Sequence, residues 1–298
     1  MLTRRTFATY AGLTTLGLGL RSVPLAAQTA TRASGELTRA LAQAEAASGG
    51  RLGVALLDKN SGMTTGYRAD ERFPLCSTFK VLAAGAVLTR VDAGQTQLGT
   101  RVRFALSDVV ANSPITKERA GAEGMTLAEL CAAAIEYSDN TAGNMLLGQI
   151  GGPARLTQFA RSLDDQVTRL DRTETDLNES LPGDLRDTTS PNAMLADLDS
   201  LVLGSALLNG SREQLTAWLR ANTTGGTRLR AGLPAGWSVG DKTGAGERGS
   251  TNDIAVIWPP GRKPALLTAY LTNTAAPVEQ RNATLAAVAR AAAAFLQA

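Results

Sequence analysis

A serine and a lysine lie three residues apart in the stretch CSTFK, residues 76–80. Ser77 and Lys80 would share one face of a helix, because side chains three positions apart on a helix are neighbours. A serine hydroxyl is a poor nucleophile unless a base removes its proton, and a lysine whose pKa is lowered by burial can act as that base. The apolar run that follows, FKVLAAGAVL, predicts a buried helix beginning near Ser77, with the hydroxyl at the positive end of the helix dipole. A helix-capping serine beside an unrelated lysine is the simpler alternative.

Two further short motifs carry polar side chains that such a nucleophile could use. SDN, at Ser138–Asn140, interrupts a strongly helical pattern, and KTG, at Lys242–Gly244, lies on a candidate strand. Each motif is weak by itself, since serine and aspartate often cap helices. Only five of the 30 basic residues are lysines, and two of those five, Lys80 and Lys242, lie in CSTFK and KTG. A role in surface charge alone is therefore the less convincing explanation for the two lysines.

The composition excludes several kinds of catalytic site. The chain has no histidine, so a Ser-His-Asp triad and a histidine-ligated zinc or haem site are excluded. The two cysteines, Cys76 and Cys131, are too few for a thiolate metal site. The sequence therefore predicts no metal and no cofactor.

The N-terminus resembles an export signal of the twin-arginine type. Arg4 and Arg5 precede a mildly apolar stretch, Phe7–Leu20, which is followed by small residues. Fourteen residues with several glycines and threonines are too few and too polar to span a bilayer comfortably. We therefore predict a signal peptide over residues 1–28, cleaved near Ala27–Ala30, and an exported protein that is periplasmic or secreted.

Removal of this leader changes the charge balance of the chain. The formal charge is +3 at pH 7, and loss of Arg4, Arg5 and Arg21 brings it to zero. The mature chain then has no basic excess to attract nucleic acid or anionic lipid. No later segment resembles a membrane span, so we expect neither nucleic acid nor membrane as a partner.

The elements that must position the motifs suggest one domain, residues 29–298, made of two lobes. Near the N-terminus the pattern predicts a helix and a hairpin, then a long, mostly helical middle, and finally three strands and a helix beginning near Val278. The predicted helix covers 34–48, the hairpin 51–70, the helical middle 77–217 and the late strands 237–246, 250–260 and 263–273. We expect an α/β (α+β) fold in which the chain ends form a five-stranded antiparallel sheet flanked by the N- and C-terminal helices. This lobe would contain residues 33–72 and 222–298, the all-helical lobe residues 73–221, and the site would lie between them.

Taken together and in this order, the three motifs resemble those of the penicillin-recognising serine enzymes. The resemblance implies that a β-lactam carbonyl acylates Ser77 and that Ser138 relays a proton to the lactam nitrogen. It implies that Asn140 contacts the acylamide side chain, and that Lys242 and Thr243 hold the substrate carboxylate.

The resemblance also supplies an oxyanion hole and a substrate-binding strand. The backbone N–H groups of Ser77 and Ala245 would form the oxyanion hole, and Gly244 belongs to the substrate-binding motif. The base that activates the serine remains open between Lys80 directly and Glu174 acting through a water.

The segment 169–191 resembles the active-site loop of class A β-lactamases. Glu174 and Asn178 match the pair that holds the deacylating water in that family, and one carboxylate plus one amide suits general-base activation of water. Arg172 and Asp187 match the salt bridge that closes the neck of the loop. The resemblance therefore implies a monomeric serine β-lactamase that acts on small-molecule β-lactams through an acyl-enzyme.

Two other functions fit the same three motifs. A DD-peptidase or penicillin-binding protein would be acylated by β-lactams and then stall, and so would a non-catalytic β-lactam sensor. Only the loop carrying Glu174 and Asn178 favours turnover over stalling.

The chain departs from the family pattern around the expected carboxylate site and at the cleft entrance. Thr251 occupies the position at which many relatives carry the arginine that grips the substrate carboxylate. A subset of relatives supplies this arginine from the preceding segment, where the chain has Arg228, so we expect Arg228 to lie beside Thr243 and face the cleft. Asn112 occupies the position of an aromatic gatekeeper in many relatives.

Two further departures concern the backbone and the thiols. In relatives the peptide after the loop glutamate is cis, usually before proline, and we predict that Glu174–Thr175 is cis although Thr175 is not proline. Cys76 and Cys131 each lack the cysteine that pairs with that position in some relatives. We therefore expect two reduced, buried thiols.

Overall fold

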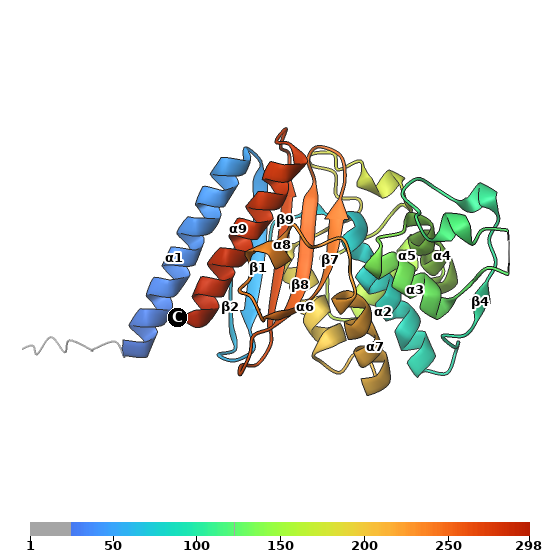
Figure 1. Ribbon diagram of the computed structural model, residues 1–298, viewed down its shortest axis with the longest axis horizontal. Helices are drawn as coiled ribbons and strands as arrows, with labels where there is room; N and C mark the ends of the chain where they lie inside the picture. Colours follow the sequence, from blue (N-terminus) through green and yellow to red (C-terminus); the bar gives the residue numbers. More distant parts are fainter. Residues whose placement is uncertain (1–24, 122) are drawn as a thin grey trace, which may run out of the picture.

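A five-stranded antiparallel sheet forms the centre of the larger layered part of the protein, in the order β2-β1-β9-β8-β7 (Figure 1). The computed structural model describes residues 25–121 and 123–298. Residues 1–24 of the predicted signal peptide lie outside this part of the chain. The strands are β1 (Arg51–Asp58), β2 (Met63–Tyr67), β7 (Ser238–Ala245), β8 (Thr251–Trp258) and β9 (Ala265–Thr272). The segment that carries KTG is thus the edge strand β7, next to the helical part of the molecule.

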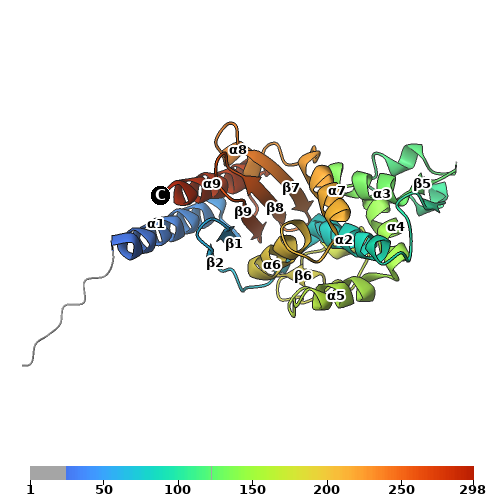
Figure 2. The same cartoon turned by 90° about the horizontal axis from the view of Figure 1, so that it is seen from below.

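Helices cover both faces of this sheet. The terminal helices α1 (Leu25–Ser48) and α9 (Val278–Gln297) lie side by side on one face, together with the short α8 (Leu229–Gly232). Helix α6 (Pro191–Val202) packs against β1 and β9 on the opposite face, as Figure 2 shows. A strand covered on both faces is apolar nearly throughout rather than alternating, which explains the run IAVIW in β8.

The side chains of β8 show how the two faces are divided. Ile254 and Val256 belong to the core shared with the helical part, whereas Ala255 and Ile257 belong to the core beneath α1 and α9. Successive residues of a strand point to opposite faces, so one strand contributes to both cores.

The helical part is built around α2 (Phe79–Asp92), which is buried from Phe79 to Leu88. Its other elements are α3 (Leu127–Glu136), α4 (Asn140–Ile150), α5 (Pro153–Ser162), α7 (Asn209–Arg220) and the short strand pairs β3–β6 (Phe73–Pro74, Thr188–Thr189) and β4–β5 (Arg101–Val102, Met125–Thr126). Thr126 caps α3 through a capping box with Glu129. Over residues 25–121 and 123–298, none of the helices is both long and apolar enough to cross a bilayer.

The predicted fold class is confirmed by this arrangement. The hairpin, the three late strands and the helix from Val278 all form where the sequence predicted them. The first helix is longer than predicted, since it begins at Leu25 rather than near residue 34. A short 3₁₀ turn, η1 (Cys76–Thr78), precedes α2, so the regular helix begins two residues after Ser77.

Candidate active site

Ser77 lies in the 3₁₀ turn at the start of the buried helix α2, where its side chain meets two charged groups. Its hydroxyl donates to Glu174 Oε1 at 3.2 Å, and Lys80 Nζ donates to Ser77 Oγ at 3.0 Å. Cys76, directly before the serine, has a positive φ of 44°. Such a conformation is strained for a residue with a side chain and is often found at functional sites. The turn therefore presents Ser77 between an amine and a carboxylate.

The Lys80 amine is fully buried and fully engaged. It donates to Ser138 O at 2.9 Å and to Asn140 Oδ1 at 2.7 Å, and it lies 3.0 Å from Glu174 Oε1. Burial lowers the pKa of Lys80 and outweighs the attraction of Glu174, which raises it. A lowered pKa makes the neutral amine, which can accept a proton from Ser77, accessible at lower pH.

The SDN motif joins α3 to α4 and is itself rigidly held. Ser138 has a positive φ of 57°, and Asp139 is the N-cap of α4, accepting from the amide of Ala142. The other carboxylate oxygen of Asp139 accepts from the amides of Ile115 and Thr116, each at 2.9 Å. Asp139 thus fixes the turn that presents the two neighbouring polar side chains to the cleft.

Glu174 is buried in the loop between α5 and α6, and hydrogen bonds hold both its side chain and its backbone. Asn178 Nδ2 donates to Glu174 Oε2 at 2.5 Å, which joins the two residues that the sequence analysis paired. Asn144 of α4 donates to Glu174 O at 2.9 Å and accepts from Glu174 N at 2.8 Å. The Glu174–Thr175 peptide is cis, as predicted. The carboxylate is therefore fixed from the loop and from α4 together.

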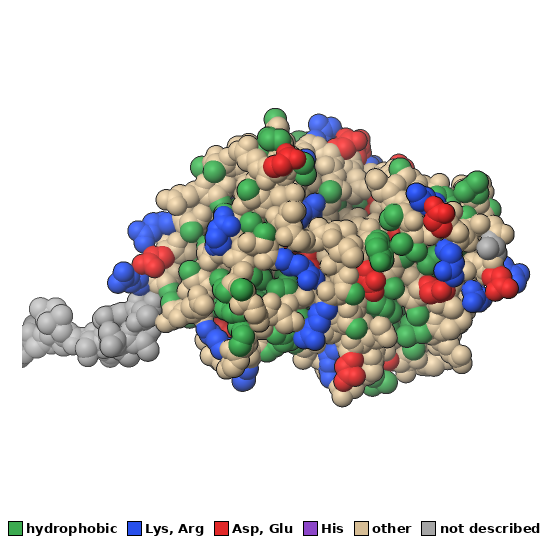
Figure 3. All heavy atoms as spheres, in the orientation of Figure 1, with side chains coloured by type: hydrophobic (Ala, Val, Ile, Leu, Met, Phe, Trp, Pro, Cys, Tyr) green, Lys and Arg blue, Asp and Glu red, His purple; other side chains and the backbone are tan. Residues whose placement is uncertain are grey.

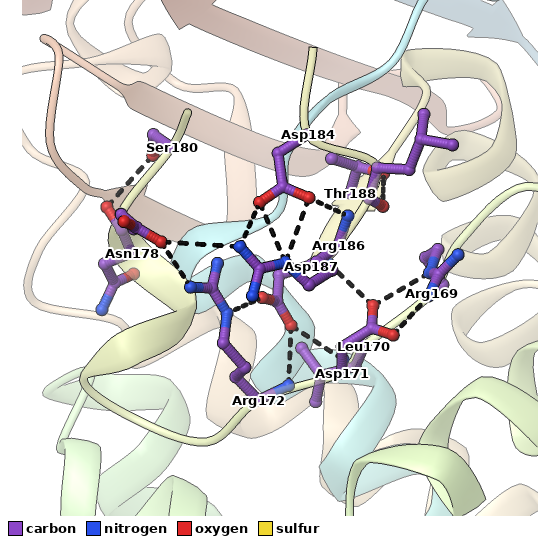
Figure 4. Close-up of polar contacts among 12 residues, drawn as sticks. Arg169, Leu170, Asp171, Arg172, Asn178, Ser180, Asp184, Arg186, Asp187 and Thr188 are labelled. Atoms are coloured by element: carbon purple, nitrogen blue, oxygen red, sulfur yellow. Dashed lines mark hydrogen bonds and ion pairs between the residues drawn. The ribbon is translucent and has the colours of Figure 1, made fainter. Parts of the chain in front are cut away.

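The neck of this loop is closed by a network around Asp187, shown in Figure 4. Asp187 Oδ1 accepts from the amides of Asp171 and Arg172 at 2.8 and 2.9 Å, and Arg172 Nε donates to Asp187 Oδ2 at 2.6 Å. Arg172 Nη1 also donates to Glu179 Oε2 at 2.6 Å. The predicted pairing of Arg172 with Asp187 is thus present in the structure.

Lys242, on β7, is fully buried and lies beside Ser138, which lines the cleft. Its Nζ donates to Ser138 Oγ at 2.9 Å and to Thr243 O at 2.8 Å. Burial and the nearby Lys80 hold the pKa of Lys242 well below its ordinary value. A Cβ on Gly244 would lie 3.2 Å from Leu75 O, so glycine lets the strand approach the turn that carries the nucleophile.

Arg228 lies at the far end of the same cleft, braced against the sheet. Its Nη1 donates to Gly244 O at 2.8 Å and to Asn252 O at 2.7 Å, and its Nε donates to Asn282 Oδ1 at 3.1 Å. Thr251 instead accepts from Arg281 Nη1 at 3.2 Å. The guanidinium thus lies beside the KTG strand and lines the cleft with Ser77, as expected.

These side chains line one open cleft of about 740 Å³ between the sheet and the helical part. It is lined by Ser77, Val109, Val110, Ala111, Asn112, Ser113, Pro114, Lys117, Tyr137, Ser138, Asn140, Asn178, Thr224, Arg228, Thr243, Gly244 and Ala245. Charged side chains of both signs are interspersed on the face of the molecule that Figure 3 shows. Asn112, the residue that the sequence places at the expected gatekeeper position, lines the cleft and has a φ of 58°.

The structure brings together every site residue that the sequence predicted, and it adds two that sequence reasoning missed. Lys80 and Glu174 meet Ser77 directly beneath the cleft, while the remaining predicted residues line its walls or hold those that do. Asn144 was missed because a single asparagine on a helix face carries no motif. Thr224, whose hydroxyl hydrogen-bonds that of Thr243, was missed because it lies in a loop of threonines and glycines.

Comparison with known proteins agrees with this geometry. Residues 36–296 match the model of the "Beta-lactamase enzyme family". The chain is 50% identical to the β-lactamase CTX-M-8 of Citrobacter amalonaticus over 275 residues, 92% of each protein, and 52% identical to OXY-1 of Klebsiella oxytoca over 84% of this chain and 86% of that protein. Among solved structures, an ancestral class A β-lactamase has a TM-score of 0.84 at 58% identity, covering 86% of this chain and 98% of its own. A putative class A β-lactamase, PenP of Rhodopseudomonas palustris, has the same TM-score at 60% identity, covering 86% and 97%.

The chain therefore belongs to the β-lactamase enzyme family, and within that family to class A. It is a β-lactamase, a hydrolase whose activity confers resistance to β-lactam antibiotics, and the enzyme class predicted from the sequence is confirmed.

Proposed function

We propose that the protein hydrolyses β-lactams through an acyl-enzyme on Ser77, which is released by a water that Glu174 activates. The observation that carries this proposal is the position of Glu174 Oε1, 3.2 Å from Ser77 Oγ and 3.0 Å from Lys80 Nζ. A carboxylate at this distance from the nucleophile is within reach, through one water, of an ester formed there.

Acylation begins when Ser77 Oγ attacks the lactam carbonyl and loses its proton. Lys80 and Glu174 both lie within hydrogen-bonding distance of that oxygen, so each has the geometry of the acylation base. The oxyanion that develops would be held by the backbone N–H groups of Ser77 and Ala245, where β7 ends against the turn. Collapse of the intermediate breaks the lactam C–N bond.

The leaving nitrogen then needs a proton, and Ser138 is the group placed to give it. Its hydroxyl accepts from Lys242 Nζ, which leaves the Ser138 O–H free to donate into the cleft. Lys242, Thr243 and Arg228 would hold the substrate carboxylate, and Asn140 would contact the acylamide side chain.

In the second half-reaction Glu174 takes a proton from a water that attacks the ester carbonyl. The Ser77–acyl C–O bond then breaks, and Ser77 Oγ regains a proton from Glu174, directly or through Lys80. Asn178 would share in holding that water, since its amide already fixes the other oxygen of Glu174. Loss of a positioned general base typically costs about 10²- to 10⁴-fold in rate.

The test is to trap the acyl-enzyme by removing this base. Glu174→Ala should react with penicillin and retain it, so mass spectrometry of the intact protein should show an adduct of the whole penicillin mass. Asp176→Ala, a change of an exposed aspartate in the same loop, should turn penicillin over without an adduct. Rapid turnover by Glu174→Ala with no adduct would refute the assignment of Glu174. Acylation without turnover by the unchanged enzyme would favour the penicillin-binding protein or sensor.

We also propose that the enzyme acts as an exported monomer. The twin-arginine start and the small residues before Ala30 support export. N-terminal sequencing of the exported protein tests the predicted cleavage near Ala27–Ala30, and its mass in solution tests the monomer.

A further inference from the structure

Two buried carboxyl groups meet beneath the neck of the loop that carries Glu174. Asp197, on α6, is fully buried, and in the described part of the chain neither of its oxygens has a hydrogen-bond partner. Asp165, which follows α5, is 6% exposed, and its Oδ2 likewise has no partner. Orphaned polar atoms in a buried site are costly, so three of them side by side require an explanation.

The other oxygen of Asp165 organises the incoming side of the loop neck. Asp165 Oδ1 accepts from the amides of Val167 and Thr168 at 2.6 and 3.0 Å. The Thr168 hydroxyl in turn hydrogen-bonds that of Thr189, on the outgoing side, at 2.7 Å. Asp165 therefore links the two sides of the neck, and whatever fixes its carboxylate also fixes the neck.

The two carboxyl groups cannot both be ionised without conflict. They lie close enough to hydrogen-bond, but two carboxylates can only accept, so a bond between them requires a proton. Burial and the neighbouring Asp165 raise the pKa of Asp197 to about 9, against the opposing effect of Arg161.

The remaining titratable groups around the pair do not supply that bond. They are Arg161 from α5, Arg72 from the segment before β3, and Tyr270 from β9. The two guanidiniums donate to backbone carbonyls and a threonine hydroxyl, and the Tyr270 hydroxyl meets another threonine. A cation shared by the carboxylates is also disfavoured, since no group of three or more suitable ligands converges anywhere in residues 25–121 and 123–298.

We propose that Asp197 is a positioning residue that carries a proton in the folded enzyme and donates it to Asp165 Oδ2. This bond ties α6 to the incoming side of the loop neck. Its bearing on hydrolysis rests on the function proposed for Glu174, but its existence does not.

A proton held in this way makes stability depend on pH in a defined direction. An unfolded aspartate has a pKa of about 3.9 and is ionised above about pH 5, whereas folded Asp197 keeps its proton up to about pH 8. The folded state then binds one more proton than the unfolded state, so stability falls as pH rises through this window. The unfolding constant should gain up to about tenfold per pH unit from this residue alone.

The experiment compares denaturant unfolding of three proteins between about pH 5 and pH 8. Asp197→Asn keeps the shape and can donate to Asp165, but it cannot ionise. The ratio of the wild-type unfolding constant to that of Asp197→Asn should therefore rise up to about 10³-fold across the window. Asp199 lies two residues further along the same helix and pairs with Lys59. The ratio of the wild-type unfolding constant to that of Asp199→Asn should therefore stay constant with pH. A constant ratio for Asp197→Asn as well would overturn the proposal, because Asp197 would then be ionised in the folded state.

A second measurement tests the positioning role and does not depend on the Asn variant folding well. Asp197→Leu fills the same space but leaves Asp165 Oδ2 without a donor. Hydrogen exchange of the peptide containing Val167 and Thr168 should speed up at least tenfold in Asp197→Leu relative to the wild type, and Asp197→Asn should restore protection. Wild-type exchange in the Leu variant would overturn the positioning role. Neither readout uses turnover, so a failure here is distinct from a failure of the acyl-enzyme assignment.

Discussion

Arg228 should hold the substrate carboxylate, and its removal should weaken productive binding of penicillins. The guanidinium lines the cleft with Ser77 and is braced by Gly244 O and Asn252 O. Loss of a hydrogen bond to a charged group costs about 1.5 to 3 kcal/mol. Since each 1.4 kcal/mol is tenfold, Arg228→Ala should lower kcat/KM for benzylpenicillin by about 12- to 140-fold, mainly through KM. Steady-state hydrolysis followed by loss of the lactam absorbance measures both constants.

Arg230 is the matched control, two residues further along the chain. It pairs with the buried Asp241 at 2.5 Å and does not line the cleft. Arg230→Ala should therefore reduce stability, because it leaves a buried carboxyl without its cation, while KM of the folded enzyme stays near the wild-type value. Arg228→Lys should recover part of the loss, since it restores the charge without the planar fork. An unchanged KM in Arg228→Ala would refute the reasoning and leave Lys242 as the sole cation for the carboxylate.

Two further predictions follow from the pKa shifts in the cleft and core. Because the pKa of Lys242 is lowered, Lys242 loses its proton as pH rises, so kcat/KM should fall on the alkaline side. Lys242→Arg stays charged and should move that fall to higher pH in a pH–rate profile. An unmoved profile would contradict a role for the charge of Lys242 in substrate binding. Cys76 and Cys131 are both free and buried, as predicted, and burial raises the pKa of Cys76 to about 12 and that of Cys131 as well. A thiol reagent should therefore label neither in the folded enzyme and both after denaturation, whereas rapid labelling before denaturation would contradict this burial.

The sequence predicts those features of the fold that depend on local pattern. Strands buried on both faces are apolar runs bounded by turn residues, and the hairpin and the three late strands have this form. The start of α1 was misjudged because residues 25–33 lack an apolar stripe that would mark a helix, although the helix continues through them. The 3₁₀ turn before α2 was missed for a similar reason, since three residues are too few to give a period.

The catalytic motifs were predictable because each combines a distinctive residue type with a fixed spacing. Residues that act through tertiary contacts have no such signature. Asn144 hydrogen-bonds the backbone of Glu174, 30 positions away in the sequence, and nothing in the local sequence of α4 predicts that contact. Asp197 did leave a trace, because it lies within the apolar face of α6 between Met194 and Leu201, where an unpaired carboxylate would be costly. Only the structure shows that Asp197 lies beside Asp165.

Two aspartates in the active-site loop form ion pairs, one buried and one at the surface, and replacing each by asparagine should have different effects. Asp187 is 1% exposed and holds two amides and the Arg172 guanidinium, whereas Asp184 pairs with Arg186, a side chain that is 46% exposed (Figure 4). Breaking a buried pair costs about 3 to 5 kcal/mol, and breaking a surface pair costs about 0 to 1 kcal/mol.

Asp187→Asn should therefore lower Tm by many degrees, at about 2 to 4 °C per kcal/mol for a domain of this order of size, while Asp184→Asn stays close to the wild type. Because the neck positions Glu174, Asp187→Asn should also slow release of the acyl-enzyme at temperatures where the variant remains folded. Mass spectrometry during turnover would detect this as a larger fraction of acylated protein. Equal Tm values for the two variants would mean that Asp187 does not hold the neck. A normal acylated fraction in a destabilised Asp187→Asn would mean that the neck contributes to stability but does not position Glu174.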